Sequence, residues 1–247
     1  MKKTENIPYA SDSPEQLLDL YLPEGPVHDV FVYFHGGGME QGDKYRSAVF
    51  APWLTERGVA LISANYRMYP NAVYPDFIRD AALATAWAKD WIRENADGAR
   101  LFVGGSSAGG YLSMMLCFDR RYLADVGMDN SRIAGYFHDA GQPTAHFNVL
   151  AYSGIDGRRV IVNEMAPLYY VGLEERYPPM RFIISDHDIQ NRLEQTMLLL
   201  STLRHFGYEG FDHVLVEGKH CAYCKRLDEK GDSVFAQMIY DFIRSVG

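Results

Sequence analysis

The chain contains the stretch Leu101-Phe102-Val103-Gly104-Gly105-Ser106-Ser107-Ala108-Gly109-Gly110-Tyr111-Leu112-Ser113-Met114-Met115-Leu116. Its first three residues are typical of a buried strand, and its last six continue as an apolar helix. The glycines between them allow a sharp, crowded turn, which lifts a serine hydroxyl into the open. The pattern G-x-S-x-G over residues 105–109 makes Ser107 the candidate nucleophile. Ser106 fits less well, because its frame ends in Ala108.

Further apolar, β-rich runs recur along the chain, and we expect them to be strands buried on both faces of a sheet. They are Val30–Phe34, Val59–Ala64, Leu101–Val103, Ile133–Phe137, Arg181–Ile184 and His213–Val216, with Leu17–Leu22 as an antiparallel strand before them. Helical patterns alternate with these runs after Pro75, over Arg192–Phe206 and over Asp232–Val246. The alternation predicts an α/β fold in which helices flank a central, mostly parallel sheet. We expect one domain over residues 1–247, with ligands bound beyond the carboxyl ends of the strands.

Residues 140–178 interrupt this alternation with a segment rich in Gly, Pro, His, Asn and Tyr. The segment begins where a central strand is expected to end. We therefore predict a cap-like insertion that shapes a pocket, and a plain surface excursion is the alternative. Fewer than thirty residues precede Val30, so any cover over the site has to come from this insertion.

A second glycine motif, His35-Gly36-Gly37-Gly38, follows the run Val30–Phe34. Consecutive glycines let a backbone approach a ligand closely and point N–H groups at it. Together the two motifs resemble those of the α/β-hydrolase fold, and within it the hormone-sensitive-lipase-like esterases and carboxylesterases, with some likeness to kynurenine formamidase-type hydrolases. The resemblance covers residues 30–118 well and the C-terminal third by the order of its motifs. It implies that the N–H groups of Gly37, Gly38 and Ala108 form an oxyanion hole.

A serine nucleophile needs a base, and the base needs a carboxylate that orients it. In this fold the order along the chain is serine, acid, histidine, with the acid and the histidine after late strands. Asp188 is the predicted acid, because it follows the strand at Arg181–Ile184 by a few residues, and Asp186 is its rival. His220 is the predicted base, because it follows the last predicted strand.

Cys221 and Cys224 form a C-x-x-C sequence beside His220. As a metal site it offers at most three adjacent ligands, and as a redox pair it lacks a position at the start of a βαβ unit. A metal that took His220 would also disable the triad. The turn around Ser107 contains no phosphate-binding or dinucleotide fingerprint. We therefore predict neither a metal nor a cofactor.

Three residues near the predicted site indicate the substrate class. Met39 follows the glycines, and His138 and Asp139 follow a central strand; they either contact a polar alcohol such as a sugar or only shape the loops. The small cover argues against a lipase. We predict a serine carboxylic ester hydrolase that cleaves small, acetyl-like esters, including those of carbohydrates, through an acyl-enzyme. The alternatives are an arylformamidase-type amide hydrolase with the same triad and a ligand-binding protein on a hydrolase fold, like the plant gibberellin receptors.

The 247 residues carry a formal charge of −8 and no basic stripe, which argues against nucleic acid or an anionic membrane as a partner. Leu101 to Phe118 contain no charged residue, but glycines break the run, so we expect no membrane helix. Three cysteines are too few for a disulfide framework, and no apolar run follows the first residues. We therefore expect no signal peptide and predict a cytoplasmic protein whose partner is a small-molecule ester.

Overall fold

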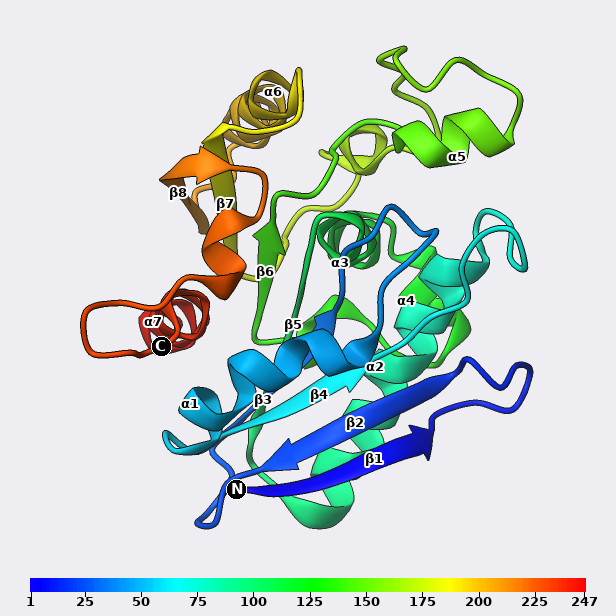
Figure 1. Cartoon of the computed structure of the whole chain (residues 1–247). Coiled ribbons are helices and arrows are strands. Elements are labelled where there is room, and N and C mark those ends of the chain that lie inside the picture. The colour runs from blue at the N-terminus through cyan, green and yellow to red at the C-terminus, as the bar shows by residue number, and fades with distance from the viewer.

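The computed structural model describes all 247 residues, and one eight-stranded sheet runs through it (Figure 1). In spatial order the strands are β1 (Lys2–Pro8), β2 (Leu17–Leu22), β4 (Val59–Ala64), β3 (Asp29–Phe34), β5 (Arg100–Ser106), β6 (Gly135–Asp139), β7 (Met180–His187) and β8 (Phe211–Lys219). The pairs β1–β2 and β2–β4 are antiparallel, and all other pairs are parallel. The mostly parallel sheet is confirmed, and a strand lies at each predicted run.

The sequence pattern does not indicate strand β1. Its seven residues, Lys2–Pro8, are exposed except for the half-buried Ile7, so no apolar alternation marks it. It pairs with β2 at the edge of the sheet, from Lys2 opposite Leu22 to Pro8 opposite Leu17. Charged side chains on an edge strand discourage pairing with another chain, which is consistent with this composition.

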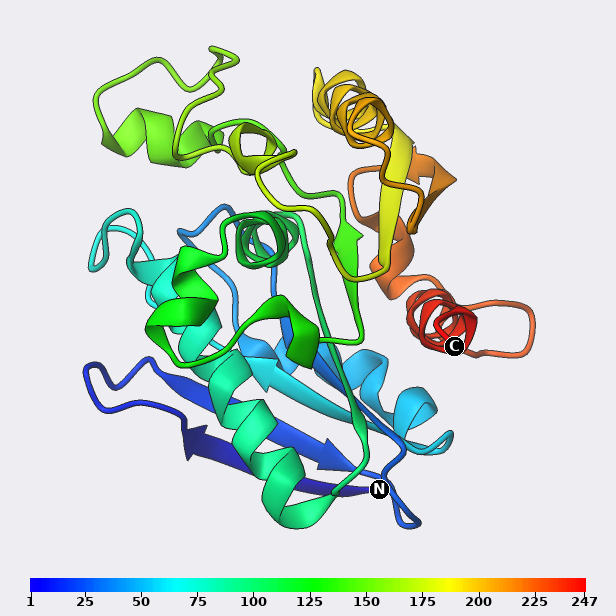
Figure 2. The same cartoon turned by 180° about the vertical axis from the view of Figure 1, so that it is seen from behind.

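Helices cover both faces of the sheet (Figures 1 and 2). One face carries α2 (Asp76–Asn95), α3 (Ala108–Phe118), α4 (Arg121–Asp125) and α6 (Arg192–His205), and the other carries α1 (Ala51–Thr55) and α7 (Val234–Ser245). Strand β3 feeds both cores, because alternate residues of a pleated strand point to opposite faces. Val30 and Val32 lie in the larger core and Phe31 in the smaller one. The three predicted helices are confirmed.

The uncharged stretch from Leu101 to Phe118 is explained by its central position. Strand β5 is the fifth strand of the eight in spatial order, and every residue of α3 is buried. A helix that is apolar on all sides belongs inside a large core. No helix in the structure combines the length and the apolar character needed to cross a membrane.

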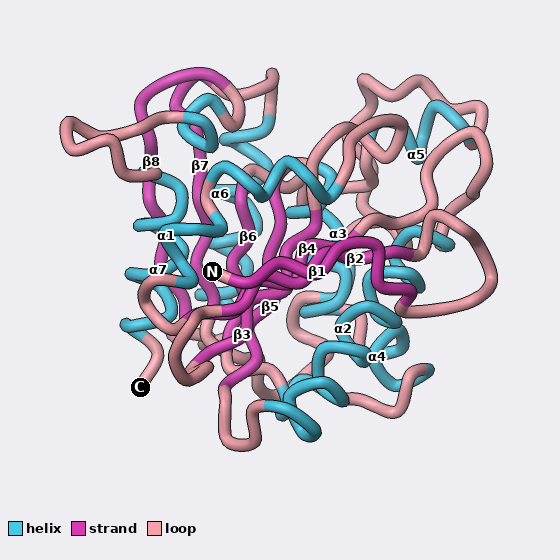
Figure 3. Tube along the Cα trace, turned by 60° about the horizontal axis from the view of Figure 1, so that its bottom comes forward, coloured by secondary structure: helices cyan, strands magenta, loops and turns pink.

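The predicted insertion, residues 140–178, lies beyond the carboxyl end of β6 and contains the short helix α5 (Phe147–Tyr152). Figure 3 shows α5 and the loops around it set apart from the strands. Two tyrosines of the main body hold the middle of the insertion: Tyr111 donates to the carbonyl of Met165, and Tyr74 donates to the carbonyl of Glu164. These two hydrogen bonds therefore hold the insertion against the helices at Glu164 and Met165.

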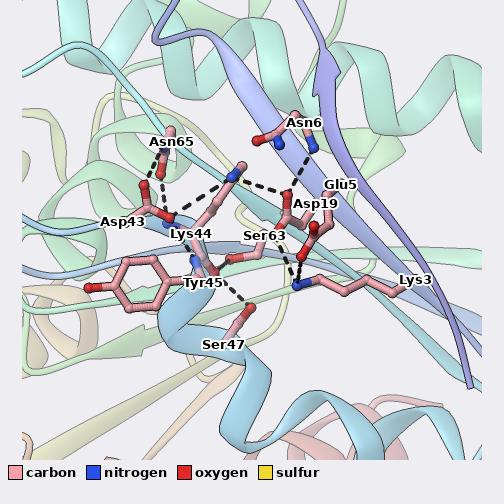
Figure 4. Close-up of polar contacts among 10 residues, drawn as sticks. All are labelled: Lys3, Glu5, Asn6, Asp19, Asp43, Lys44, Tyr45, Ser47, Ser63 and Asn65. Atoms are coloured by element: carbon pink, nitrogen blue, oxygen red, sulfur yellow. Dashed lines mark hydrogen bonds and ion pairs between the residues drawn. The ribbon is translucent and has the colours of Figure 1, made fainter.

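A buried polar cluster anchors the chain after the second glycine motif (Figure 4). The ammonium group of Lys44 lies 3.1 Å from Asp19 of β2, and both side chains are almost fully buried. The backbone N–H of Lys44 donates to the Asn65 side chain, and the carbonyl of Lys44 accepts from Ser63 of β4. Asn65 also donates to Asp43. These contacts fix where the segment after β3 returns to the sheet.

Replacing Lys44 with methionine is expected to lower the free energy of unfolding by about 3 kcal/mol, because it leaves the buried Asp19 carboxylate without its nearest cation. Chemical denaturation of the purified variant measures the loss. The double variant Lys44→Met with Asp19→Asn is the control, and it should recover part of the stability by removing the unpaired charge. A single variant as stable as the wild type would contradict the anchoring role.

Candidate active site

Ser107 occupies the turn between β5 and α3 in a backbone conformation that is rare for a residue with a side chain. Its φ is 56° and its ψ is −112°. The turn is held on both sides: the N–H of Ser107 donates to the carbonyl of Asp139, and its carbonyl accepts from the N–H of Tyr111. Such strain persists only where the surroundings enforce it, and it is frequent at functional sites. The turn leaves Ser107 partly exposed, whereas the neighbouring Ser106 is buried.

Glycine is required beside Ser107 because α3 starts in contact with β3. A Cβ atom on Gly109 would lie 1.9 Å from the carbonyl oxygen of Phe34. A Cβ atom on Gly105 would lie 2.5 Å from the backbone of Gly109. No side chain fits at either position without moving backbone, so the G-x-S-x-G pattern has a steric cause here.

The loops after β7 and β8 bring two side chains to Ser107. The Nε2 atom of His220 lies 2.8 Å from Ser107 Oγ, and its Nδ1 atom lies 2.5 Å from Oδ1 of Asp188. A carboxylate only accepts hydrogen bonds, so Nδ1 carries the proton and Nε2 is free to accept from the serine hydroxyl. The structure thus joins three of the predicted residues, 113 and 32 positions apart along the chain, in one hydrogen-bonded line.

The two rival residues lie elsewhere. Asp186 bonds the side chain of His187 and the N–H of Gly218, and so it does not contact His220. The hydroxyl of Ser106 accepts from Tyr33 on the other side of the turn. Geometry therefore favours Asp188 over Asp186 and Ser107 over Ser106.

The environment of His220 favours its protonated form over the neutral ring that can accept the proton of Ser107. Burial alone would lower the pKa of His220, but the hydrogen bond that its Nδ1–H donates to Asp188 and the neighbouring Cys221 outweigh this effect and raise the pKa to about 9. The side chain of Asp188 is only 1% exposed, and its Oδ1 also accepts from the N–H of Ile189. The imidazole is thus held in one orientation by a buried carboxylate.

The second glycine motif forms a tight loop next to this line. Gly37 has a φ of 132°, and a Cβ atom on it would lie 1.7 Å from the carbonyl oxygen of Gln41. The N–H groups of Gly37 and Gly38 donate to no turn or loop hydrogen bond. Ala108 is the first residue of α3, so its N–H has no acceptor within the helix. All three of these N–H groups are free to bind an anion.

The three predicted substrate contacts are buried. Met39 belongs to the larger core, and His138 is 1% exposed, with its Nδ1 bonded to the hydroxyl of Ser113. Asp139 is fully buried and bonds the hydroxyl of Tyr223. All three side chains are buried: Met39 lies in the loop after β3, and His138 and Asp139 are the last two residues of β6.

Arg192 is the residue near the site that the sequence pattern does not single out. It is 2% exposed at the start of α6, and its guanidinium donates to the carbonyl of Ala140 and, at 3.2 Å, to Gln142. Burial lowers the pKa of Arg192, and the charge of Asp188 opposes this effect. A cation at a helix N-terminus is unfavourable. An arginine at the start of a predicted helix was therefore the sequence feature that could have pointed to a special role for Arg192.

A cavity of about 500 Å³ lies next to the loop that follows Asp188, and neither Ser107, Asp188 nor His220 lines it. Its walls are the loop that follows Asp188 and the part of the insertion around α5, where Asn148 donates to the carbonyl of Gly38. Only four of the 14 lining residues are hydrophobic. The lining residues are Gln142, Phe147, Asn148, Ala151, Asp156, Gly157, Arg158, Arg159, Val160, Ile189, Gln190, Asn191, Arg192 and Gln195. The insertion therefore forms one wall of a cavity whose residues are mostly polar by type, but whose exposed surface comes more from apolar than from polar atoms.

Comparison with known proteins identifies the family and the fold. A family model described as BD-FAE matches residues 18–151, more than half of the chain, and this range includes both glycine motifs. Probable carboxylesterase 1 of Arabidopsis thaliana is 29% identical over 147 residues, which cover 50% of this chain and 45% of that protein. Hormone-sensitive lipase of Homo sapiens is 30% identical over 118 residues, which cover 47% of this chain and 11% of that protein. The chain spans less than half the length of these curated relatives.

Among solved structures, a truncated form of a carbohydrate esterase from gut microbiota superposes with a TM-score of 0.76 at 19% identity, covering 100% of this chain and 96% of that one. At this level of identity the similarity concerns the fold. The predicted α/β-hydrolase fold and the relationship to hormone-sensitive lipase and carboxylesterases are confirmed.

Proposed function

The chain belongs to the BD-FAE family of α/β hydrolases, and we propose from this membership and from the site that it is a serine-dependent carboxylic ester hydrolase. The observation that carries the proposal is the hydrogen-bonded line from Ser107 through His220 to Asp188, at 2.8 and 2.5 Å. A serine hydroxyl is a weak nucleophile until a positioned base takes its proton, and this line supplies that base.

In the proposed reaction Ser107 Oγ attacks the acyl carbon while its proton moves to Nε2 of His220. The resulting imidazolium is stabilised by Asp188 and then gives the proton to the leaving alcohol oxygen. Water, activated by the same imidazole, cleaves the acyl-enzyme and restores Ser107. Before substrate binds, Nε2 of His220 already contacts the Ser107 hydroxyl and Nδ1 already contacts Asp188, as these reaction steps require.

The negative oxygen of the tetrahedral intermediate is assigned to the N–H groups of Gly37, Gly38 and Ala108. The freedom of these donors and the left-handed backbone of the glycine loop support the assignment. Each donor of this kind contributes about 3 kcal/mol to stabilising the transition state.

We further propose a small acyl group, of acetyl size, and a hydroxyl-rich alcohol such as a sugar. Ten of the 14 residues that line the cavity are not hydrophobic, and their amides and guanidinium groups can bind hydroxyls of an alcohol. The small cover that the insertion provides supports the small acyl group. Met39, His138 and Asp139 are left out of this proposal, because their side chains are buried.

Hydrolysis of p-nitrophenyl acetate, butyrate and octanoate tests the acyl preference. The value of kcat/KM for acetate is expected to exceed that for octanoate by at least about tenfold, because the small insertion gives a long acyl chain little cover from water. An acetylated monosaccharide and formanilide, assayed under the same conditions, separate ester cleavage from arylformamidase-type amide cleavage. Faster turnover of octanoate or of formanilide would contradict the proposed substrate class. No turnover of any of these, with ligand binding intact, would favour a binding protein.

A further inference from the structure

A second group of reactive side chains lies next to His220, outside the proposed catalytic line. Cys221 directly follows His220, and Cys224 lies in the short 3-10 helix η4 (Ala222–Lys225). The sulfur of Cys224 is 3.5 Å from Oδ2 of Asp139, and the sulfur of Cys221 is 4.0 Å from the same oxygen. The three atoms, one carboxylate oxygen and two sulfurs, all lie within 4.8 Å of one another.

The Asp139 carboxyl is buried without a positive partner. It is fully buried, and its hydrogen-bond partners are a phenol, from Tyr223, and the two thiols. Burying an acidic group away from cations is unfavourable unless something compensates it. A cation bound at Oδ2 would supply that compensation.

The spacing of the three atoms fits a tetrahedral zinc ion. Zinc binds cysteine sulfur at about 2.3 Å and carboxylate oxygen at about 2.0 Å, so a sulfur and an oxygen on one ion lie about 3.5 Å apart. The sulfur–oxygen distance is 3.5 Å for Cys224, which matches this spacing, and 4.0 Å for Cys221, which has to move by about half an ångström. All three cysteines of the chain are free, so both thiols are available as ligands.

We propose that Asp139, Cys221 and Cys224 bind one thiophilic divalent cation, with Zn²⁺ as the best fit and water in the fourth position. Binding replaces the protons of the two thiols and of the buried Asp139 carboxyl, which pass to solvent, and forms two metal–sulfur bonds and one metal–oxygen bond. The ion ties the loop that carries His220 to the end of β6. It does not need His220 as a ligand, whose two nitrogens already bond Ser107 and Asp188.

The position of Asp139 removes the conflict between metal binding at the C-x-x-C sequence and catalysis by His220. From sequence alone the third ligand had to be the adjacent His220, and metal binding then excluded the triad. In the fold the third ligand is Asp139, more than eighty residues upstream, so the two sites coexist. A disulfide between the two cysteines would use the same spacing, but it would leave the carboxylate oxygen between the sulfurs without a role.

Titration with Co²⁺, followed by optical absorption, tests the proposal on the fully reduced protein. The wild type is expected to bind one equivalent with the charge-transfer absorption of thiolate–cobalt bonds and the visible bands of a tetrahedral ion, and Zn²⁺ should displace it. Cys221→Ser and Cys224→Ser should each bind at least about 100-fold more weakly. The matched control is Cys117→Ala, which removes the buried cysteine of α3 and should leave the titration unchanged.

Thermal unfolding supplies a second measurement. At a Zn²⁺ concentration about 100 times Kd, the melting temperature of the wild type should rise by about 5 °C or more, and that of Cys224→Ser should not. A cobalt spectrum that persists in both serine variants would overturn the proposal. So would a Cys221–Cys224 disulfide in the isolated protein combined with no metal binding after reduction. Because none of these readouts uses ester turnover, they are independent of the proposed function.

Discussion

Replacing Ser107 with alanine is expected to lower kcat/KM for p-nitrophenyl acetate at least about 10³-fold, with the fold and the stability close to those of the wild type. The hydroxyl is the only atom removed, and it lies 2.8 Å from Nε2 of His220 in a partly exposed turn. Steady-state kinetics measure the effect. Circular dichroism and thermal unfolding confirm that the strained turn between β5 and α3 survives the change.

Ser106→Ala is the matched control for this variant. Ser106 is the adjacent residue of the same motif, but it is buried and its hydroxyl bonds Tyr33, so its loss should change kcat/KM by less than about tenfold. If Ser107→Ala kept most of the activity and Ser106→Ala abolished it, the proposed nucleophile would be wrong. If both variants kept the activity of the wild type, a serine mechanism at this turn would be excluded.

The fold could be predicted from the sequence because its central elements leave a local pattern. Strands such as β3 are buried on both faces and therefore read as continuous apolar runs. Edge strand β1 leaves no such pattern, since its stability comes from pairing with β2 and not from burial of its own side chains. From sequence alone, such charged residues are predicted to be an exposed terminal segment, because the strand they pair with is not known.

The site was predictable where chemistry fixes both the residue type and its position after a strand. Ser107 and His220 meet these conditions, and the structure brings them together with Asp188. Orientation was not predictable. His138 and Asp139 were expected to follow a central strand, where a substrate contact would lie, but they are the last two residues of β6 and both side chains are buried. Whether a side chain at a strand end faces solvent or the core depends on the neighbouring loops, which the local sequence does not describe.

Asp188→Asn is expected to lower kcat/KM by about 10³- to 10⁴-fold, although it changes the shape of the side chain very little. The carboxylate holds His220 in the tautomer that leaves Nε2 free to accept the proton of Ser107. An asparagine amide either donates to Nδ1, which moves the ring proton to Nε2, or accepts without a charge that stabilises the imidazolium. Both outcomes raise the barrier for the attack.

The matched variant is Asp186→Asn, two residues earlier and near the end of β7. Asp186 accepts hydrogen bonds from the side chain of His187 and from the N–H of Gly218. The amide oxygen of the asparagine variant can still accept both. This variant should keep kcat/KM within about tenfold of the wild type. The opposite pattern, with Asp186→Asn inactive and Asp188→Asn active, would transfer the role of the acid to Asp186. It would also require the loop after β7 to rearrange when substrate binds, because the two carboxylates point to different partners in the resting structure.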